Sequence, residues 1–307
     1  MSVDVSSPPT DPAAIDAVPL RHPWRWVAAI VIVFLAVLFL YGAATNQAYG
    51  WSTFGKYVLD ERIMGGVWVT IQLTVLSMIL AVVLAVLLAV MRLSPNPVFR
   101  SVSWVYLWIF RGTPVYVQLV FWGLIPVIYK RIQLGIPFGP TFFELNIQNL
   151  SMYFLLAVLG LGFNEAAYLA EIIRAGISSV PEGQSEASTA LGMSWLLAMR
   201  RTVLPQAMRV IIPPTGNEFI SQLKTTSLVT AVPLTVDLYG QQRNISAVIF
   251  QPVPMLLVAA FWYLLITSIL MVGQFYLERY FSRGVSRKLT GKQLEALAKA
   301  QLGTGNI

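Results

Sequence analysis

Cysteine is absent from the 307-residue sequence, and histidine occurs once, at His22. Without cysteine the chain can form no disulfide, thiolate metal site or cysteine nucleophile. A single histidine also excludes a histidine metal cluster. No GxxxxGK[ST] phosphate-binding loop occurs, so we expect no nucleotide hydrolysis by this chain alone. The sequence therefore predicts a protein that is not an enzyme and holds no metal or cofactor.

Charge is also scarce. Charged residues make up 11% of the chain and hydrophobic residues 56%, whereas about a quarter of the residues of a soluble domain are charged. Apolar runs long enough to cross a bilayer recur along the sequence. These runs predict an all-α integral membrane protein with about six transmembrane helices, at Trp26–Ala44, Gly65–Met91, Val102–Val127, Met152–Ile173, Val210–Val232 and Met255–Tyr276.

The net charge of +7 comes from basic residues in the segments between these runs. No basic tract interleaved with aromatics occurs, so we do not expect nucleic-acid binding. Basic residues collect on cytoplasmic loops, and one set of segments holds most of them: Arg21, Arg25, Arg92, Arg100, Arg174, Arg200, Arg201, Arg209, Arg279, Arg283, Arg287 and Lys288. The opposite set holds Lys56, Arg62, Lys130, Arg131 and Arg243. This asymmetry predicts that both termini are cytoplasmic.

The stretch EGQSEASTALG, Glu182–Gly192, is polar and small-sided within an otherwise apolar chain. Ser179 and Glu182 have the spacing of a capping box, and Gly192 is a natural helix terminator. Ser194 begins a further helix that we expect to end near Pro205. The sequence thus predicts a short cytoplasmic helix with small side chains, which another protein can approach closely. The pattern alone favours docking and a merely solvated loop about equally.

Several motifs in order resemble the membrane subunits of ATP-binding-cassette importers, in particular the polar amino acid branch. They are RGTPVYVQL (111–119), AAYLAEIIRAGISSVPEGQSEASTALGMS (166–194), LPQAMRVIIPPTGNEFISQLKTTSLV (204–229) and TIQLTVLS (70–77). The resemblance runs from about Gly65 to Gly284 and includes the family's "EAA" loop. Ser188 stands where the family usually has alanine and Thr202 where it usually has an aliphatic residue, so we expect Thr202 to weaken one apolar contact.

The resemblance implies a five-helix type I importer permease core at 63–284. An extra transmembrane helix with its external loop is expected at 23–62, a disordered cytoplasmic tail at 1–22 and a cytoplasmic tail at 285–307. It also implies a bacterial plasma (inner) membrane location and several partners. These are an ATPase subunit that binds ATP and Mg, an extracytoplasmic solute-binding protein, a second permease, identical or paralogous, and a polar amino acid substrate.

In this family the "EAA" loop docks into the ATPase, and the resemblance assigns coupling to Glu182, Glu186, Ala187, Ser188 and Gly192. Two spans resemble the helices that line the translocation path. They carry polar residues that are expensive inside a membrane and usually face a cavity or a partner: Asn164, Glu165, Tyr168, Glu171, Asn217, Glu218, Gln222, Lys224 and Thr225. Each of them could instead only fix packing through an interhelical hydrogen bond or ion pair.

A zwitterionic substrate needs both signs of charge along its path. Lys224 could meet an α-carboxylate, and Glu218 or Glu165 an α-ammonium, whereas Arg111 is expected to make a structural or gating contact. Pro205 and the Pro213–Pro214 pair are expected to break the fifth span near its cytoplasmic end. The alternative is a secondary transporter or channel that works alone, although no inverted repeat is evident.

Overall fold

The computed structural model describes residues 23–129, 131–136, 139–146 and 150–281; the tails expected at 1–22 and 285–307 lie outside these ranges. The first elements in chain order are α1 (Pro23–Thr45), η1 (Gln47–Tyr49), α2 (Trp51–Tyr57), α3 (Glu61–Leu93), α4 (Pro97–Gly112), α5 (Val115–Ile128), β1 (Arg131–Gly135) and β2 (Thr141–Asn146). They are followed by α6 (Leu150–Ser178), α7 (Glu182–Ala190), α8 (Trp195–Ala198), η2 (Met199–Val203), α9 (Leu204–Thr225), η3 (Thr226–Ala231), α10 (Leu238–Ile249) and α11 (Pro252–Phe281).

The chain divides into two compact units, residues 1–49 and 50–307. In the first unit α1 is a continuous apolar helix over the predicted first span, and none of its residues is buried. An apolar helix that exposes its side chains all round is suited to a lipid environment.

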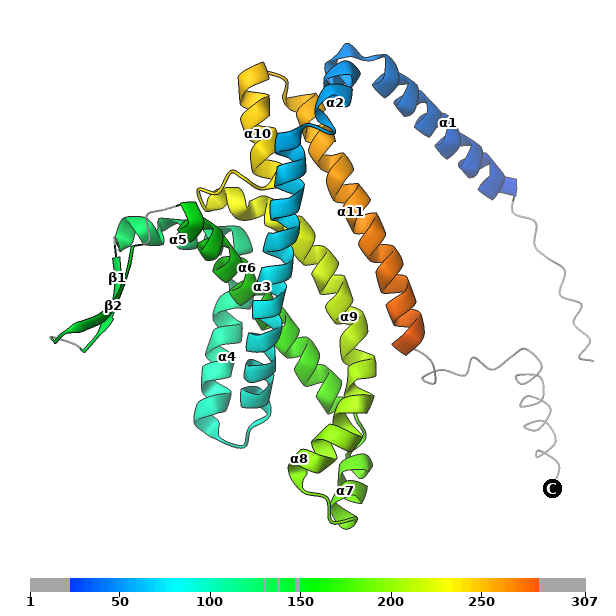
Figure 1. The fold of residues 1–307 in the computed structure, drawn as a ribbon. Helices are drawn as coiled ribbons and strands as arrows, with labels where there is room; N and C mark the ends of the chain where they lie inside the picture. The colour runs from blue at the N-terminus through cyan, green and yellow to red at the C-terminus, as the bar shows by residue number, and fades with distance from the viewer. Residues whose placement is uncertain (1–22, 130, 137–138, 147–149, 282–307) are drawn as a thin grey trace, which may run out of the picture. The chain divides into compact units, whose positions relative to one another are not determined.

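The second unit is a bundle in which the long helices α3, α6, α9 and α11 run side by side (Figure 1). Its centre is α6, which packs against α3, α4, α5 and α9. Small residues allow the backbones of α3 and α6 to approach closely, as is usual for helices packed in membranes. A Cβ added at Gly162 of α6, for example, would lie 2.8 Å from Leu80 Cδ2 of α3.

Within the described residues, four helices are long and apolar enough to cross a membrane: α1, α3, the Met152–Ser178 part of α6, and α11. They confirm four of the six predicted spans and the all-α class. The predicted third span is two helices, α4 and α5, with a break at Thr113–Pro114. The fifth is α9 extended by the 3-10 turns of η3.

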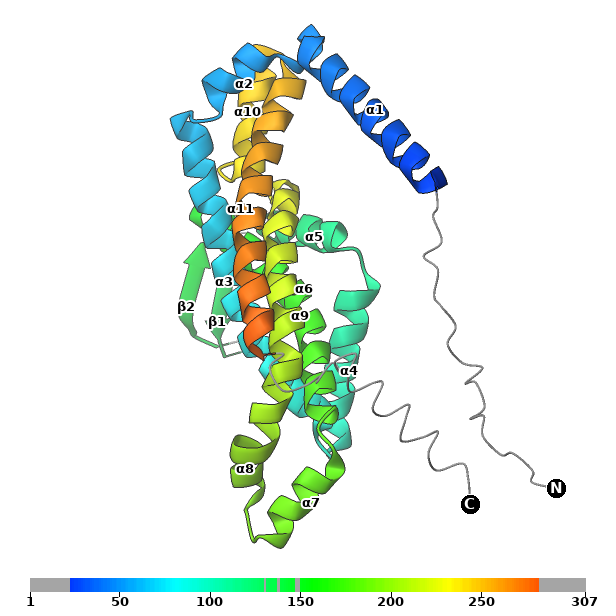
Figure 2. The ribbon, with the colours of Figure 1, turned by 90° about the vertical axis from the view of Figure 1, so that its right-hand side faces the viewer.

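The predicted breaks in the fifth span were wrong. Pro205 lies at the start of α9, directly after the π-helical segment η2, and α9 continues through Pro213 and Pro214. The helix expected to end near Pro205 instead passes from α8 through a π-helical segment, η2, directly into α9. One helical rod therefore connects the region after α7 to the middle of the bundle (Figure 2).

A small antiparallel hairpin joins α5 to α6 and was not predicted. Strands β1 and β2 pair with Arg131 opposite Asn146, and a bulge interrupts the register between Leu134 and Gly135. The hairpin lies in the segment that the charge pattern assigns to the external side, away from α7 and α8 (Figure 1).

The α10 helix is fixed against the first turns of α3 by backbone contacts. Asp237 caps α10 by accepting a hydrogen bond from the Tyr239 N–H, and the Leu238 N–H donates to the Thr70 hydroxyl of α3 at 3.1 Å. Opposite this turn lies Gly66, where an added Cβ would meet the Leu238 Cα at 2.9 Å and the Asp237 carbonyl oxygen at 3.0 Å. Because both obstacles are backbone atoms, they cannot move aside as a side chain would.

We therefore expect Gly66→Ala to destabilise the bundle by about 1–3 kcal/mol through overpacking. The adjacent Gly65 provides a matched control, since nothing lies within 4 Å of a Cβ added there. Gly65→Ala should stabilise α3 by about 0.5–1 kcal/mol because alanine has the higher helix propensity. Thermal unfolding of both variants in detergent measures the difference, and equal shifts in Tm would contradict the close approach of α3 and α10.

Candidate substrate cavity and coupling helix

The break between α4 and α5 is stabilised by two side-chain amides. In a continuous helix the Phe110 carbonyl would accept from the N–H of residue 114, but proline has none. Gln118 Nε2 donates to this carbonyl at 2.9 Å and Asn164 Nδ2 of α6 at 3.1 Å. Gln118 Nε2 also lies 3.0 Å from the Thr113 carbonyl oxygen. The freed backbone groups are thus satisfied inside the bundle, as a membrane interior demands.

A cavity of about 520 Å³ lies beside this break, between the α4–α5 turn, α6 and α9. Its lining residues are Arg111, Gly112, Thr113, Pro114, Val115, Asn164, Glu165, Tyr168, Glu218, Ser221, Gln222 and Thr225. Six of the nine residues predicted for the substrate path therefore meet in one cavity. Pockets of a few hundred cubic ångströms are of a size that holds small ligands.

Two carboxylates and one guanidinium set the charge of this cavity. Glu165 is 5% exposed, and its Oε1 is buried without a hydrogen-bond partner. Glu218 of α9 is near enough to interact with it electrostatically. Arg111 lines the same cavity, with its guanidinium carbon 5.5 Å from the Tyr168 ring centroid, the geometry of a cation–π contact. A buried carboxylate with an unused oxygen is suited to receive a cationic ligand.

Two of the lining residues also have packing roles. The Gln222 amide, 2% exposed, donates to the Ser77 hydroxyl of α3 at 3.0 Å. Asn164 holds the Phe110 carbonyl and bonds Gln118 Oε1 at 3.1 Å. Asn164 and Gln222 therefore make interhelical hydrogen bonds, the packing role that the sequence left as an alternative, and both also line the cavity.

The other three predicted path residues do not line this cavity: Glu171, Asn217 and Lys224. Glu171 instead forms an ion pair with Arg174, one turn later on α6. Arg111 occupies the cavity where Lys224 was expected to supply the positive charge. Lys224 is exposed on α9 and does not line the cavity, whereas its neighbours Gln222 and Thr225 do.

Thr113, Ser221 and Gln118 were not among the predicted path residues. Thr113 and Ser221 line the cavity, and Gln118 supports the turn beneath it. The dipeptide Thr113–Pro114 was the available signal, because a proline within an apolar run marks a helix boundary.

The helix α7 confirms the predicted short helix but not its predicted start. The capping box is wrong: Pro181 occupies the N-cap position, and the Ser179 hydroxyl donates to the Gly176 carbonyl at 2.7 Å. Ser179 is thus engaged by the last turn of α6. Ser194 does precede α8 as predicted, although its side chain makes no capping hydrogen bond.

Gly192 ends α7 in a Schellman motif, as its position predicted. Its φ is +74°, in the left-handed region that glycine adopts without strain. The Met193 N–H bonds the Ser188 carbonyl at 3.1 Å, and the Gly192 N–H bonds the Thr189 carbonyl at 2.9 Å. The reversal of the chain after α7 depends on this one backbone conformation.

Four of the five predicted coupling residues are exposed: Glu182, Glu186, Ala187 and Gly192. Ser188 is 4% exposed, and its hydroxyl lies 2.9 Å from that of Thr202. Thr202 was expected to weaken an apolar contact; in the structure it takes part in a hydrogen bond instead. Ser188 therefore faces the bundle, while its neighbours present a polar surface with small side chains.

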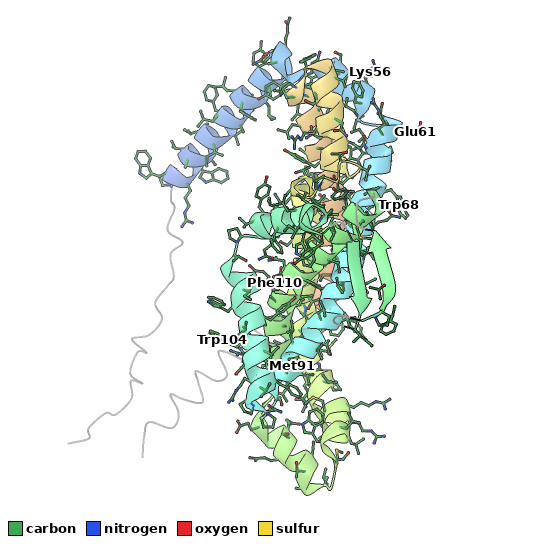
Figure 3. The ribbon with its side chains drawn as sticks, turned by 90° about the vertical axis from the view of Figure 1, so that its left-hand side faces the viewer. Lys56, Glu61, Trp68, Met91, Trp104 and Phe110 are labelled. Carbon is green, nitrogen blue, oxygen red and sulfur yellow. The ribbon has the colours of Figure 1, made fainter. Side chains whose placement is uncertain are left out.

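Three of the basic residues assigned to the cytoplasmic side, Arg92, Arg200 and Arg201, lie at the α7 end of the second unit. Arg92 is in the last turn of α3, and Arg200 and Arg201 lie in η2. In Figure 3 Met91 lies toward this end, whereas Lys56 and Glu61 lie at the opposite end. For these described residues, the charge asymmetry predicted from the sequence corresponds to the two ends of the bundle.

Comparison with known proteins connects this arrangement to transport. Residues 81–283 match the family model described as "Binding-protein-dependent transport system inner membrane component". The arginine transport system permease protein ArgU of Corynebacterium glutamicum is 62% identical over 291 residues, 94% of this chain and 90% of the relative. The histidine/lysine/arginine/ornithine transport system permease protein HisM of Escherichia coli is 36% identical over 67% of this chain and 83% of its own.

Two solved structures of transporters also resemble this chain. The crystal structure of an amino acid ABC transporter with histidines has a chain 32% identical to this one, with a TM-score of 0.58 over 71% of this chain and 94% of that chain. A chain of the inward-facing MetNI methionine ABC transporter, 19% identical, shares the fold with a TM-score of 0.53 over 71% of this chain and 95% of its own.

The hydrogen bonds at the α4–α5 break generate a prediction. We expect Gln118→Met to destabilise the protein by about 1–3 kcal/mol, because the Phe110 and Thr113 carbonyls lose a side-chain donor. Gln241→Met is a matched control, since the Gln241 amide makes a longer 3.3 Å contact with the Thr235 carbonyl on an exposed side. Thermal unfolding in detergent compares the two variants. An unchanged Tm for Gln118→Met would show that the break does not need the Gln118 amide.

Proposed function

This chain belongs to the family of binding-protein-dependent transport system inner membrane components, and we propose that it forms the path of a cationic amino acid. It is a membrane subunit of an ABC importer and carries no nucleotide-binding loop of its own. The names of its relatives support an amino acid substrate, and two of them name arginine. The observation that carries the cationic class is the charge pattern of the cavity.

An amino acid with a cationic side chain presents one negative and two positive groups. The cavity offers the complement, one guanidinium at Arg111 and two carboxylates at Glu165 and Glu218. In this arrangement Arg111 meets the α-carboxylate, and the two glutamates meet the α-ammonium and the side-chain cation. This charge pattern favours the ligand with matching charges and rejects an acidic one, whose side-chain carboxylate would lie beside one of the two glutamates without a cationic partner.

The remaining parts of the system follow from the family. In our proposal an ATPase subunit binds ATP and Mg and receives α7, a solute-binding protein delivers the substrate on the external side, and a second permease completes the path. The α7 end of the bundle is then cytoplasmic, as are both termini. The polar, small-sided surface of α7 supports this docking role, because small side chains permit close approach and Glu182 and Glu186 provide charged contacts.

The substrate proposal is tested with the transporter reconstituted in vesicles together with its ATPase and binding protein. Glu165→Gln and Glu218→Gln should each lower arginine uptake at least about tenfold, the loss expected when an ion pair with the substrate worth a few kcal/mol is removed. Glu61→Gln, at the exposed start of α3, is the control and should transport normally. Wild-type protein should import arginine and lysine but not glutamate. Glutamate import at the arginine rate would overturn the cationic assignment.

The coupling proposal is tested at the end of α7. Gly192→Val forces a β-branched residue into the left-handed region at a cost of about 1–3 kcal/mol and should abolish ATP-driven uptake. Gly192→Asn should retain most of it, since asparagine tolerates this conformation. Glu186→Lys should also abolish uptake by reversing a charge on the docking surface. Normal uptake by both Gly192→Val and Glu186→Lys, or uptake by the chain without any ATPase, would favour the stand-alone transporter.

A further inference from the structure

Two side-chain contacts join α7 to the rod that leads into α9. The hydroxyls of Ser188 and Thr202 lie 2.9 Å apart, and Gln206 Nε2 donates to Gln184 Oε1 at 3.2 Å. The partners are spaced by four residues on each side, 184 and 188 on α7 and 202 and 206 on η2 and α9. Side chains four residues apart lie on one face of a helix, so the contacts form two successive rungs, which we call the polar ladder.

The donors and acceptors of the ladder are internally satisfied. The Ser188 hydroxyl also lies 2.8 Å from the Gln184 carbonyl oxygen, and a hydroxyl has a single proton to donate. Because the Ser188 hydroxyl donates this proton in a hydrogen bond to the Gln184 carbonyl, the Ser188 oxygen can accept a hydrogen bond from the Thr202 hydroxyl. Gln206 Nε2 in turn donates to the Thr202 carbonyl at 2.9 Å, which joins the two rungs on the α9 side.

Burial makes the Ser188 rung the stronger attachment. Of the nine residues of α7, Ser188 alone is buried. The Gln184 rung lies at the exposed edge. A hydrogen bond shielded from water contributes more than an exposed one, and loss of one partner leaves the other polar group unsatisfied.

The rod on the other side of the ladder leads to the cavity. Thr202 lies in the π-helical segment η2, which continues without interruption into α9. The same α9 carries Glu218 and Gln222, two cavity-lining residues, four to five turns further on. On its other side α7 is joined to α6 through the turn at Ser179–Pro181.

We propose that the polar ladder makes α7 and the start of α9 move as one body, so that a displacement of α7 is transmitted to the cavity through α9. Ser188 and Thr202 are positioning residues: they touch neither the substrate nor the docking surface. This inference rests on the proposed function, because it needs an ATPase that moves α7. It specifies that α9, rather than α6, receives the motion of α7, and that the side chains of the polar ladder transmit it.

The absence of cysteine allows a direct test by cross-linking. Hydroxyl oxygens 2.9 Å apart place positions 188 and 202 within reach of a disulfide. Ser188→Cys/Thr202→Cys should, when oxidised, retain ATP-driven arginine uptake within about twofold of the reduced form, since the bond joins parts that already move together. The unmodified chain with the same partners controls for oxidation elsewhere. Uptake that falls on oxidation and returns on reduction would overturn the proposal, because α7 and η2 would then have to separate.

Removal of the rung gives the complementary test. Ser188→Ala and Thr202→Val should each lower the arginine imported per ATP hydrolysed about threefold or more, while the ATPase still co-purifies. Ser188→Ala/Thr202→Val should lose less than the product of the two single losses, because no hydroxyl is left without its partner. Unchanged import per ATP in both single variants, multiplicative losses, or loss of co-purification would each contradict the ladder. If wild-type uptake needs no ATPase, the proposed function itself fails.

Discussion

The structure depends on one constraint: inside a bilayer, no water is present to donate a hydrogen bond to a backbone carbonyl that lacks a helical partner. Pro114 creates such a carbonyl at Phe110, and Gln118 and Asn164 satisfy it from two helices. These two hydrogen bonds allow α4 and α5 to form separate helices. The turn between them then presents its backbone and Arg111 to a cavity rather than to lipid.

The cavity and its charges follow from that break. The same Asn164 that holds the Phe110 carbonyl lies one residue from Glu165 and one turn from Tyr168, so the support of the turn and the lining of the cavity are built on one face of α6. The carboxylates of Glu165 and Glu218 come from different helices and meet where α6 and α9 cross. In the proposed function a zwitterionic substrate needs a positive group in the cavity, and the turn supplies it through Arg111, which lies over the Tyr168 ring.

The α9 helix connects this cavity to the segment that contacts α7. Because η2 and α9 form one rod, the residues that contact α7 and the α9 residues that line the cavity, such as Glu218 and Gln222, belong to one continuous helical segment. Motion entering at Thr202 is therefore expected to reach Glu218 as a displacement of the whole helix.

The sequence by itself determined the membrane class, the positions of most spans, the short helix ending at Gly192 and the family, because these depend on local composition and on motifs contiguous in the chain. It also placed six cavity residues on the right helix faces, since 3.6-residue periodicity is a local property. The tertiary structure alone decided that Arg111 rather than Lys224 faces the carboxylates and that Thr202 meets Ser188. It also decided that Asn164 satisfies a carbonyl 54 residues away. Each of these depends on which helices adjoin and at what rotation, and hydrogen-bond partners on different helices leave no mark in the local sequence.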